Sequence, residues 1–181
     1  MSLSSSSWSN TLLTLMQNVG LIGQENYKFA GAVAEGSVRS LVGKGYAIAG
    51  TKNPGNGIGL TGVAPSFVSG LIITNSTLAF GGSGYALPLL AVAVENAMIV
   101  EILKASLKGT SSGAIVPGTI SVSGAEWGQN IFQAGLSRNF QGKDWPTFAN
   151  IIGQSCATGF STVTGVLSGG GDPGAGKGTI S

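Results

Sequence analysis

The sequence predicts a mainly α fold: one domain over residues 1–181, built from three pseudo-repeats of a helix pair that are joined by extended glycine-rich straps. Three observations predict it. Two long segments follow the same plan 119 residues apart, apolar residues recur at helical spacing, and many of the 31 glycines gather in straps after the helices. Units of this kind cannot bury an apolar face alone, so they stack on one another.

The repeat is clearest between the first and last thirds of the chain. Matched pairs are Trp8/Trp127, Gly23/Gly142, Phe29/Phe148 and Pro54/Pro173. At about half this offset Glu35 falls on Glu95, which supports three units of about 60 residues. The units are expected at about 1–62, 63–122 and 123–181.

The first unit is expected to contain two helices and a strap. Ser4–Ser7 supply N-caps for the first helix, which Gly20 and Gly23 end. Asn26 can cap the second helix, whose many Ala and Gly residues allow close packing against other helices. From Gly43 the chain is expected to be extended.

The middle unit is the most diverged. Ala64–Phe80 suits a first helix, although its Ile and Thr residues suit a strand equally well. The following apolar segment, with Pro88 near its start, is the strongest helix signal in the chain. Glu95 and Asn96 interrupt it, leaving less than the about 20 apolar residues of a bilayer span. A core or interface helix is favoured over a transmembrane one.

The third unit opens on a capping-box pattern from Ser123 to Glu126, in front of a first helix. Asp144 is expected to cap the second helix, ahead of Pro146. From Gly165 the chain is glycine-rich to its last residue.

One segment has the form of a reactive motif. GDPGAGKGT, from Gly171 to Thr179, resembles the phosphate-binding loop of adenylate kinases, and this resemblance implies that Lys177 reaches the phosphates. Such a loop needs a helix directly after it, because the helix N-terminus supplies aligned amides and a positive dipole. Only two residues follow, and the matching frame at Asn53–Thr61 has Ile58 in place of the lysine. A glycine-rich repeat tail is therefore favoured.

Other chemistry is sparse, so no enzyme activity, cofactor or metal is expected. The chain has no His, which excludes a Ser-His-Asp triad and most metal sites. Its seven acidic residues are spread widely; Glu35 and Glu95 could form an inward polar pair, but solvated or hydrogen-bonded roles are favoured. Cys156, the one cysteine, lies in an apolar run and is expected to be a buried thiol.

Composition points to a protein covered by other proteins. Only 9% of the residues are charged, about a third of the usual share, and the 9 basic and 7 acidic residues are scattered. This excludes a footprint for nucleic acid or an anionic membrane. A homo-oligomer, or contact with other structural proteins of one assembly, is expected. Candidate core or interface anchors are Trp8, Phe29, Trp127 and Phe148.

In composition and build the whole chain resembles small virion proteins of tailed bacteriophages: it is small, rich in Gly, Ser and Thr, poor in charge, and begins without a secretory signal pattern. The resemblance implies a structural subunit located in the virion after assembly in the host cytoplasm, in a tail, baseplate, neck or capsid-associated position. It transfers no individual residues. The alternatives are a membrane-active protein that inserts residues 86–107 as a helix, and a nucleotide-binding protein.

Overall fold

The structure is a computed structural model that describes residues 3–43, 45–52, 56–61, 68–81, 86–109, 115–161, 164–168 and 175–179. Its helices are α1 (Ser5–Asn18), α2 (Asn26–Leu41), α3 (Val68–Phe80), α4 (Ala86–Lys104), α5 (Gly124–Leu136) and α6 (Trp145–Phe160). Its strands are β1 (Gly45–Lys52), β2 (Asn56–Thr61), β3 (Ser106–Gly109), β4 (Ile115–Ser121), β5 (Thr164–Ser168) and β6 (Ala175–Thr179). Helices hold the larger part of the described residues, which confirms the mainly α prediction.

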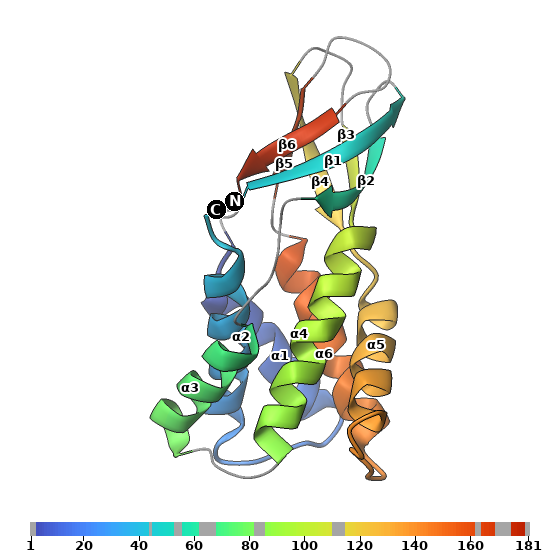
Figure 1. The fold of residues 1–181 in the computed structure, drawn as a ribbon. Coiled ribbons are helices and arrows are strands. Elements are labelled where there is room, and N and C mark those ends of the chain that lie inside the picture. Colours follow the sequence, from blue (N-terminus) through green and yellow to red (C-terminus); the bar gives the residue numbers. More distant parts are fainter. Residues whose placement is uncertain are drawn as a thin grey trace.

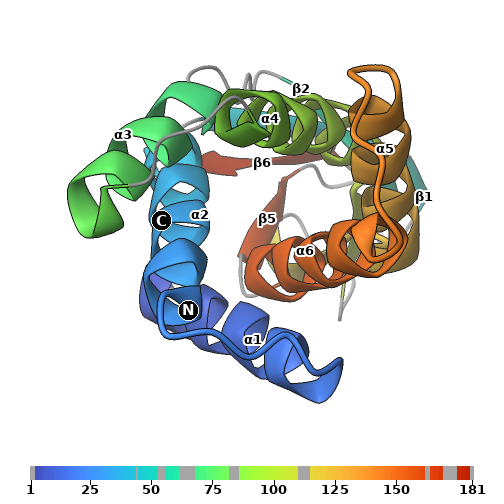
Figure 2. The same cartoon turned by 90° about the horizontal axis from the view of Figure 1, so that it is seen from below.

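The helices form a bundle with the strands gathered at one end (Figure 1). Each helix packs against its neighbours in the sequence, and α6 packs against α1, so that the contacts run around a ring (Figure 2). The odd-numbered helices run away from the strands and the even-numbered helices run back toward them (Figure 1). The bundle therefore has a barrel end and an opposite end, which we call the helical end.

The strands form a closed antiparallel barrel in sequence order, in which β6 pairs with β1. Each even-numbered helix is followed by one hairpin: β1–β2, β3–β4 and β5–β6. Closure joins the first hairpin to the last, because Gly45 lies opposite Thr179. The extended segments after Gly43 were predicted as straps between helix pairs. The structure instead pairs them with one another, since a closed barrel satisfies backbone groups that single straps would leave unpaired.

Glycine suits the strands to a narrow barrel. Residues that lie opposite each other in a ladder share a face of the sheet, and one such row is Gly109, Gly118 and Gly165 across β3, β4 and β5. Strands that lack a Cβ at such positions can curve and approach closely. Two register irregularities in β1, between Ala47 and Ala49 and between Gly50 and Lys52, are also consistent with strong local curvature.

The structure resolves the choice between helix and strand for the first segment of the middle unit. Residues 68–80 of the segment predicted over 64–80 form helix α3, and residues 64–67 lie outside the described part. Its β-branched residues are tolerated because the helix packs on α2: Ile72 is fully buried against Gly36, where a side chain would collide with it. Tertiary packing thus overrides the strand propensity of this segment.

Two predicted N-caps are confirmed. The Ser4 and Ser123 hydroxyls accept hydrogen bonds from the amides of Ser7 and Glu126, each at 3.3 Å, at the starts of α1 and α5. Asn26 does not cap α2, because the helix begins at this residue. The side-chain amide of Asn26 instead donates a hydrogen bond to the Leu21 carbonyl at 2.6 Å.

Asp144 holds the N-cap position of α6, but its side chain makes no capping hydrogen bond, because its backbone is already in the helical region. The predicted N-cap position of Asp144 is therefore confirmed, but the prediction that its side chain caps the helix is wrong.

The first and last thirds of the chain contain matching backbone hydrogen bonds, offset by the predicted 119 residues. One matched pair closes the ends of α1 and α5: the Leu21 amide bonds to the Met16 carbonyl, and the Phe140 amide to the Gly135 carbonyl, both at 2.9 Å. Three further pairs match in the same way: Trp8–Ser4 with Trp127–Ser123, Phe29–Glu25 with Phe148–Asp144, and Val42–Val38 with Ser161–Ala157. Gly20 and Asn139, also matched, both have positive φ.

Candidate interaction surface

The two tryptophans predicted as core or interface anchors lie in the core. Trp8 and Trp127 are fully buried and are the fourth residues of α1 and α5. Trp8 packs against Gly159, where any side chain would overlap the indole, and Trp127 lies edge-on to Phe160 at 6.4 Å between ring centroids. Neither has surface for a partner, so their role as interface candidates is corrected to that of core anchors.

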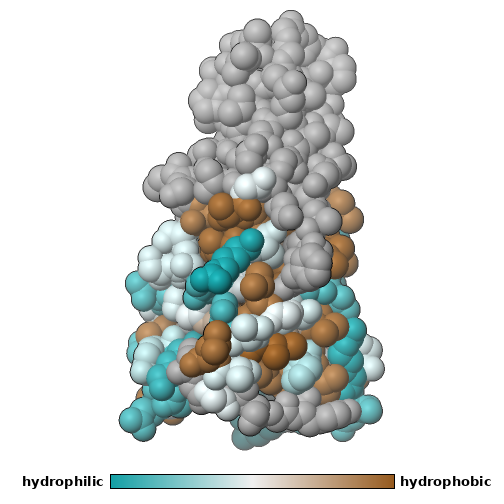
Figure 3. Space-filling view, turned by 60° about the vertical axis from the view of Figure 1, so that its left-hand side comes forward, coloured by the Kyte–Doolittle hydropathy of each residue, from teal (hydrophilic) through white to brown (hydrophobic). Residues whose placement is uncertain are grey.

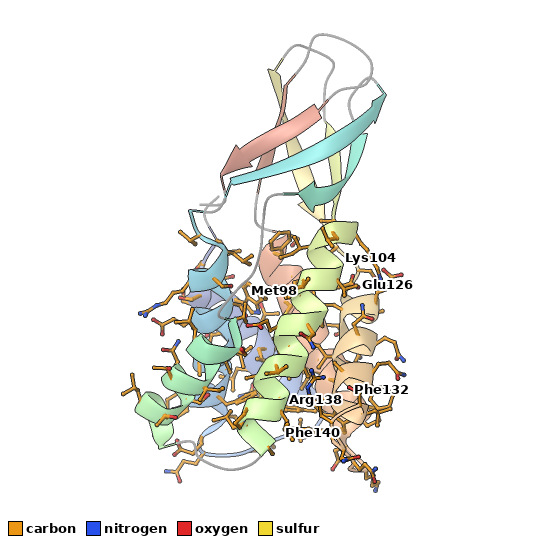
Figure 4. All side chains as sticks on the ribbon, viewed as in Figure 1. Met98, Lys104, Glu126, Phe132, Arg138 and Phe140 are labelled. Atoms are coloured by element: carbon orange, nitrogen blue, oxygen red, sulfur yellow. The ribbon has the colours of Figure 1, made fainter. Side chains whose placement is uncertain are left out.

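The two phenylalanines are only partly buried and contact each other, with ring centroids 5.5 Å apart. Phe29 and Phe148 are the fourth residues of α2 and α6, near the helical end. Trp145 and Phe140 continue the cluster, since Trp145 lies 6.4 Å from Phe148 and 4.7 Å from Phe140. An aromatic layer therefore lies beneath the helical end, where Figure 4 shows Phe140 and Arg138.

Glu35 and Glu95 do not form an inward pair. Glu35 forms an ion pair with Arg39 one turn along α2, on the protein surface. Glu95 accepts hydrogen bonds from the Ser69 amide at 2.8 Å and the Ser69 hydroxyl at 3.0 Å, at the start of α3. The favoured interpretation of these two carboxylates, solvated or hydrogen-bonded side chains, matches what the structure shows.

Glu101 is a buried carboxylate that the sequence analysis missed. One oxygen accepts hydrogen bonds from Asn130 of α5 at 2.5 Å and from Lys104 at 3.2 Å. The other oxygen is buried and has no hydrogen-bond partner among the described residues. Its place in α4 matches those of Leu41 in α2 and Phe160 in α6, both fully buried. The spacing of the apolar residues in α4 could have shown that Glu101 occupies a position where an apolar residue is expected.

Cys156 is a free thiol in the core of α6, as predicted. Burial raises its pKa well above the ordinary value, and weaker interactions with Ser155 and Trp8 lower it only in part. The thiol is therefore held protonated and unreactive at neutral pH.

The phosphate-loop-like motif does not form a phosphate loop in its described part. Ala175–Thr179 is strand β6, and Gly176 and Lys177 each pair with β1 on one side and β5 on the other. Backbone groups used in two ladders are not free to surround a phosphate. Residues 171–174 of the motif lie outside the described part. Among the described residues no group of three or more His, Cys, Asp or Glu side chains could hold a metal ion.

One helix passes a simple test for a membrane span. By length and composition α4 could cross a bilayer, with a mean hydropathy of 1.9. In this structure it packs between α3 and α5, and eight of its residues are buried, Glu101 and Met98 among them. Figure 4 labels Met98 on this helix. The segment 86–107 predicted for insertion is not one helix, because Ser106 and Leu107 belong to β3.

Exposed large apolar side chains lie at both ends of the bundle. At the helical end they are Val19, Ile22, Tyr27, Leu78 and Leu136; toward the barrel they are Val42, Ile99, Val100 and Leu103. Figure 3 shows several apolar residues on one face of the bundle, with a strongly hydrophilic side chain lying among them and further hydrophilic residues at the edges. A shallow groove of about 460 Å³ between α2 and α3 reaches Leu78 and is floored by Gly31 and Ala32. These features fit contact with protein better than enclosure of a small ligand.

No protein family, curated protein or solved structure matches this chain.

Proposed function

We propose that this chain is a non-enzymatic structural subunit of a large complex, a virion component of a tailed bacteriophage in a tail, baseplate, neck or capsid-associated position. The observation that carries the proposal is the set of exposed apolar side chains, to which all three thirds of the chain contribute, on a sequence with only 9% charged residues. Monomeric proteins rarely leave large apolar patches uncovered. Partner proteins would cover them in an assembly.

The described carboxylates support the absence of an enzymatic role. Glu25 and Glu35 form surface ion pairs with neighbours in sequence, and Glu95 binds the start of α3. Glu101 is enclosed between α4 and α5. Each of these four carboxylates is explained by a structural contact, and they do not converge on a groove where a substrate could bind.

The same proposal includes three pseudo-repeats, each a helix pair followed by one hairpin. Their support is the element order, which is helix, helix, strand, strand in each third of the chain. The matched hydrogen bonds of the first and last units add to it. Fused repeats of this kind bury, by packing on one another, the apolar faces that single units would leave exposed.

Fractionation of particles tests the function. Lysates of cells in which the gene is expressed in its natural setting are separated on a density gradient, and the chain is quantified by mass spectrometry. We expect it in the fractions that contain DNA-filled particles, at a constant ratio to the other particle proteins. Recovery only in the slowly sedimenting fractions would rule the proposal out.

A second candidate function, membrane insertion through α4, is favoured by the length and apolar character of that helix. It would require α4 to leave the bundle and expose Glu101 to lipid, which is costly. Flotation with vesicles of neutral and anionic lipids separates the two functions. Co-flotation supports insertion, and a protein that stays at the bottom of the gradient supports assembly.

Nucleotide binding is tested separately. We expect ATP to leave the melting temperature unchanged both in the natural protein and in Lys177→Ala, since β6 is paired on both sides. A shift that ATP causes in the natural protein and not in the variant would support the nucleotide-binding alternative.

A further inference from the structure

The helical end carries exposed apolar side chains from all three units. Ile22, in the connection between α1 and α2, is 86% exposed. Leu78, in the last turns of α3, is 80% exposed, and Leu136, at the end of α5, is 39% exposed. The odd-numbered helices all end here, as Figure 2 shows from this side. Ile22 and Leu136 lie at or just after the ends of α1 and α5, whereas Leu78, two residues before the end of α3, also lines the groove between α2 and α3. Among the described residues, these three exposed apolar side chains therefore come from the ends of α1, α3 and α5.

The backbone beneath these side chains is firmly built. Both described connections close with the same 2.9 Å hydrogen bond, to Met16 in one and to Gly135 in the other. The Phe29–Phe148 contact lies behind them. The Trp145 indole also donates to the Phe132 carbonyl at 3.2 Å, which fixes the start of α6 against α5. An end face held in this way is preorganised for contact, which lowers the entropy cost of binding.

The charges around the helical end have both signs. Glu25 and Lys28 form an ion pair 2.8 Å apart at the start of α2, and Lys143 and Asp144 are exposed before α6. Arg138, after the end of α5, adds a third basic side chain, so among the described residues the rim has three basic and two acidic groups. An anionic membrane would favour a rim of basic residues alone. A rim of mixed sign can instead face a copy of itself, since a carboxylate of one molecule can meet an ammonium group of the other.

We propose that two copies of this chain associate through their helical ends, end to end, with the barrels pointing apart. This inference rests on the proposed structural function and names one of its partners. Six helices of about 10 Å diameter present roughly 500 Å² on each copy, and a total of about 1,000 Å² is at the lower limit of specific interfaces. The dimer should therefore be reversible and depend on protein concentration.

Sedimentation velocity on the full chain, over a concentration series, tests the proposal. The natural protein should shift from monomer to dimer. Ile22→Glu and Leu78→Glu should each weaken the dimer at least tenfold, because each brings a charge into the contact. Both side chains are almost fully exposed, so the variants should fold. Thermal melting of each variant checks this.

Leu103→Glu is the matched control, since Leu103 is 54% exposed but lies near the barrel end of α4. It should leave the dimer intact. A natural protein that stays monomeric at several hundred micromolar would overturn the proposal. So would a dimer that survives both end variants, or one that only Leu103→Glu disrupts, and in these two cases assembly itself would stand. The presence of the chain in particles is measured independently, so either idea can fail without the other.

Discussion

Phe29 and Phe148, 119 residues apart in sequence and each the fourth residue of its helix, contact each other with ring centroids 5.5 Å apart. Residues that match under the repeat thus meet in space. The contact joins the first third of the chain to the last at the helical end, which agrees with the repeats that we propose. The contact links the sequence repeat to the closure of the helix ring.

Replacing either phenylalanine by alanine should lower the free energy of unfolding by about 2 kcal/mol, below the usual range for a fully buried Phe, because both rings are partly exposed. In the double variant the two losses should fall short of additivity by about 0.5–1.5 kcal/mol, the usual coupling of an aromatic pair. Urea unfolding of the four proteins measures the cycle. Strict additivity would mean that the rings are not coupled in solution.

Gly153→Ala should be strongly destabilising. Gly153 of α6 meets Gly128 of α5 backbone to backbone, and a Cβ there would overlap the Gly128 amide. Since backbone cannot move aside as a flexible side chain can, we expect a loss of about 3 kcal/mol or more. Gly70→Ala in α3 is the control, because nothing lies within 4 Å of its added Cβ. It should stabilise the protein by about 0.5–1 kcal/mol through helix propensity. Equal effects at the two sites would contradict the close crossing of α5 and α6.

Glu101→Leu should leave stability unchanged or raise it by about 1 kcal/mol or more, since a leucine fills the matching place in α2 and the carboxylate has an unpaired buried oxygen. Asn130→Ala should instead cost about 1–3 kcal/mol, because it removes a donor and leaves the buried charge in place. Chemical denaturation of both variants gives the comparison. A large loss in Glu101→Leu together with a neutral Asn130→Ala would show that the carboxylate is needed for more than its contact with α5.

Cys156 should not react with a thiol reagent at pH 8 until the protein unfolds, because burial raises its pKa. The sign of the pH effect follows from this shift. The folded state keeps the proton on Cys156. The contribution of this thiol to the free energy of unfolding is therefore complete below the ordinary pKa of 9.0, and it is lost as the pH rises above 9.0, where the thiol of the unfolded chain ionises. The stability difference between the natural protein and Cys156→Ala should therefore shrink from pH 8 to pH 10. Rapid reaction of the folded protein would contradict burial of the thiol.

The helices were predictable because their signals are local. Ser4 and Ser123 mark two starts, and the repeat placed Phe29 over Phe148 at equivalent helix positions. The barrel was not predictable, because its closing pair, β1 with β6, joins strands more than 120 residues apart, and glycine-rich strands show little alternation of apolar and polar residues. Local patterns could indicate an extended backbone, but they could not show what it pairs with.

The candidate surface was predictable only in part. Large aromatic residues are common both in interfaces and in protein cores, so sequence alone does not separate the two roles. The structure shows that Trp8 and Trp127 are fully buried and belong to the core. Ile22 and Leu78 gave no signal of their own, since an exposed apolar residue becomes informative only once the fold shows what surrounds it. The helical end is therefore a property of the tertiary structure.

The most direct test of a structural role is cryo-electron microscopy of purified particles that contain the chain. We expect density for a six-helix bundle capped by a barrel, at an ordered position in the particle, with the helical end around Ile22 and Leu78 covered by protein. Particles without such density would contradict the assembly role. Particles in which the bundle is ordered but its helical end is open to solvent would contradict the covered end face.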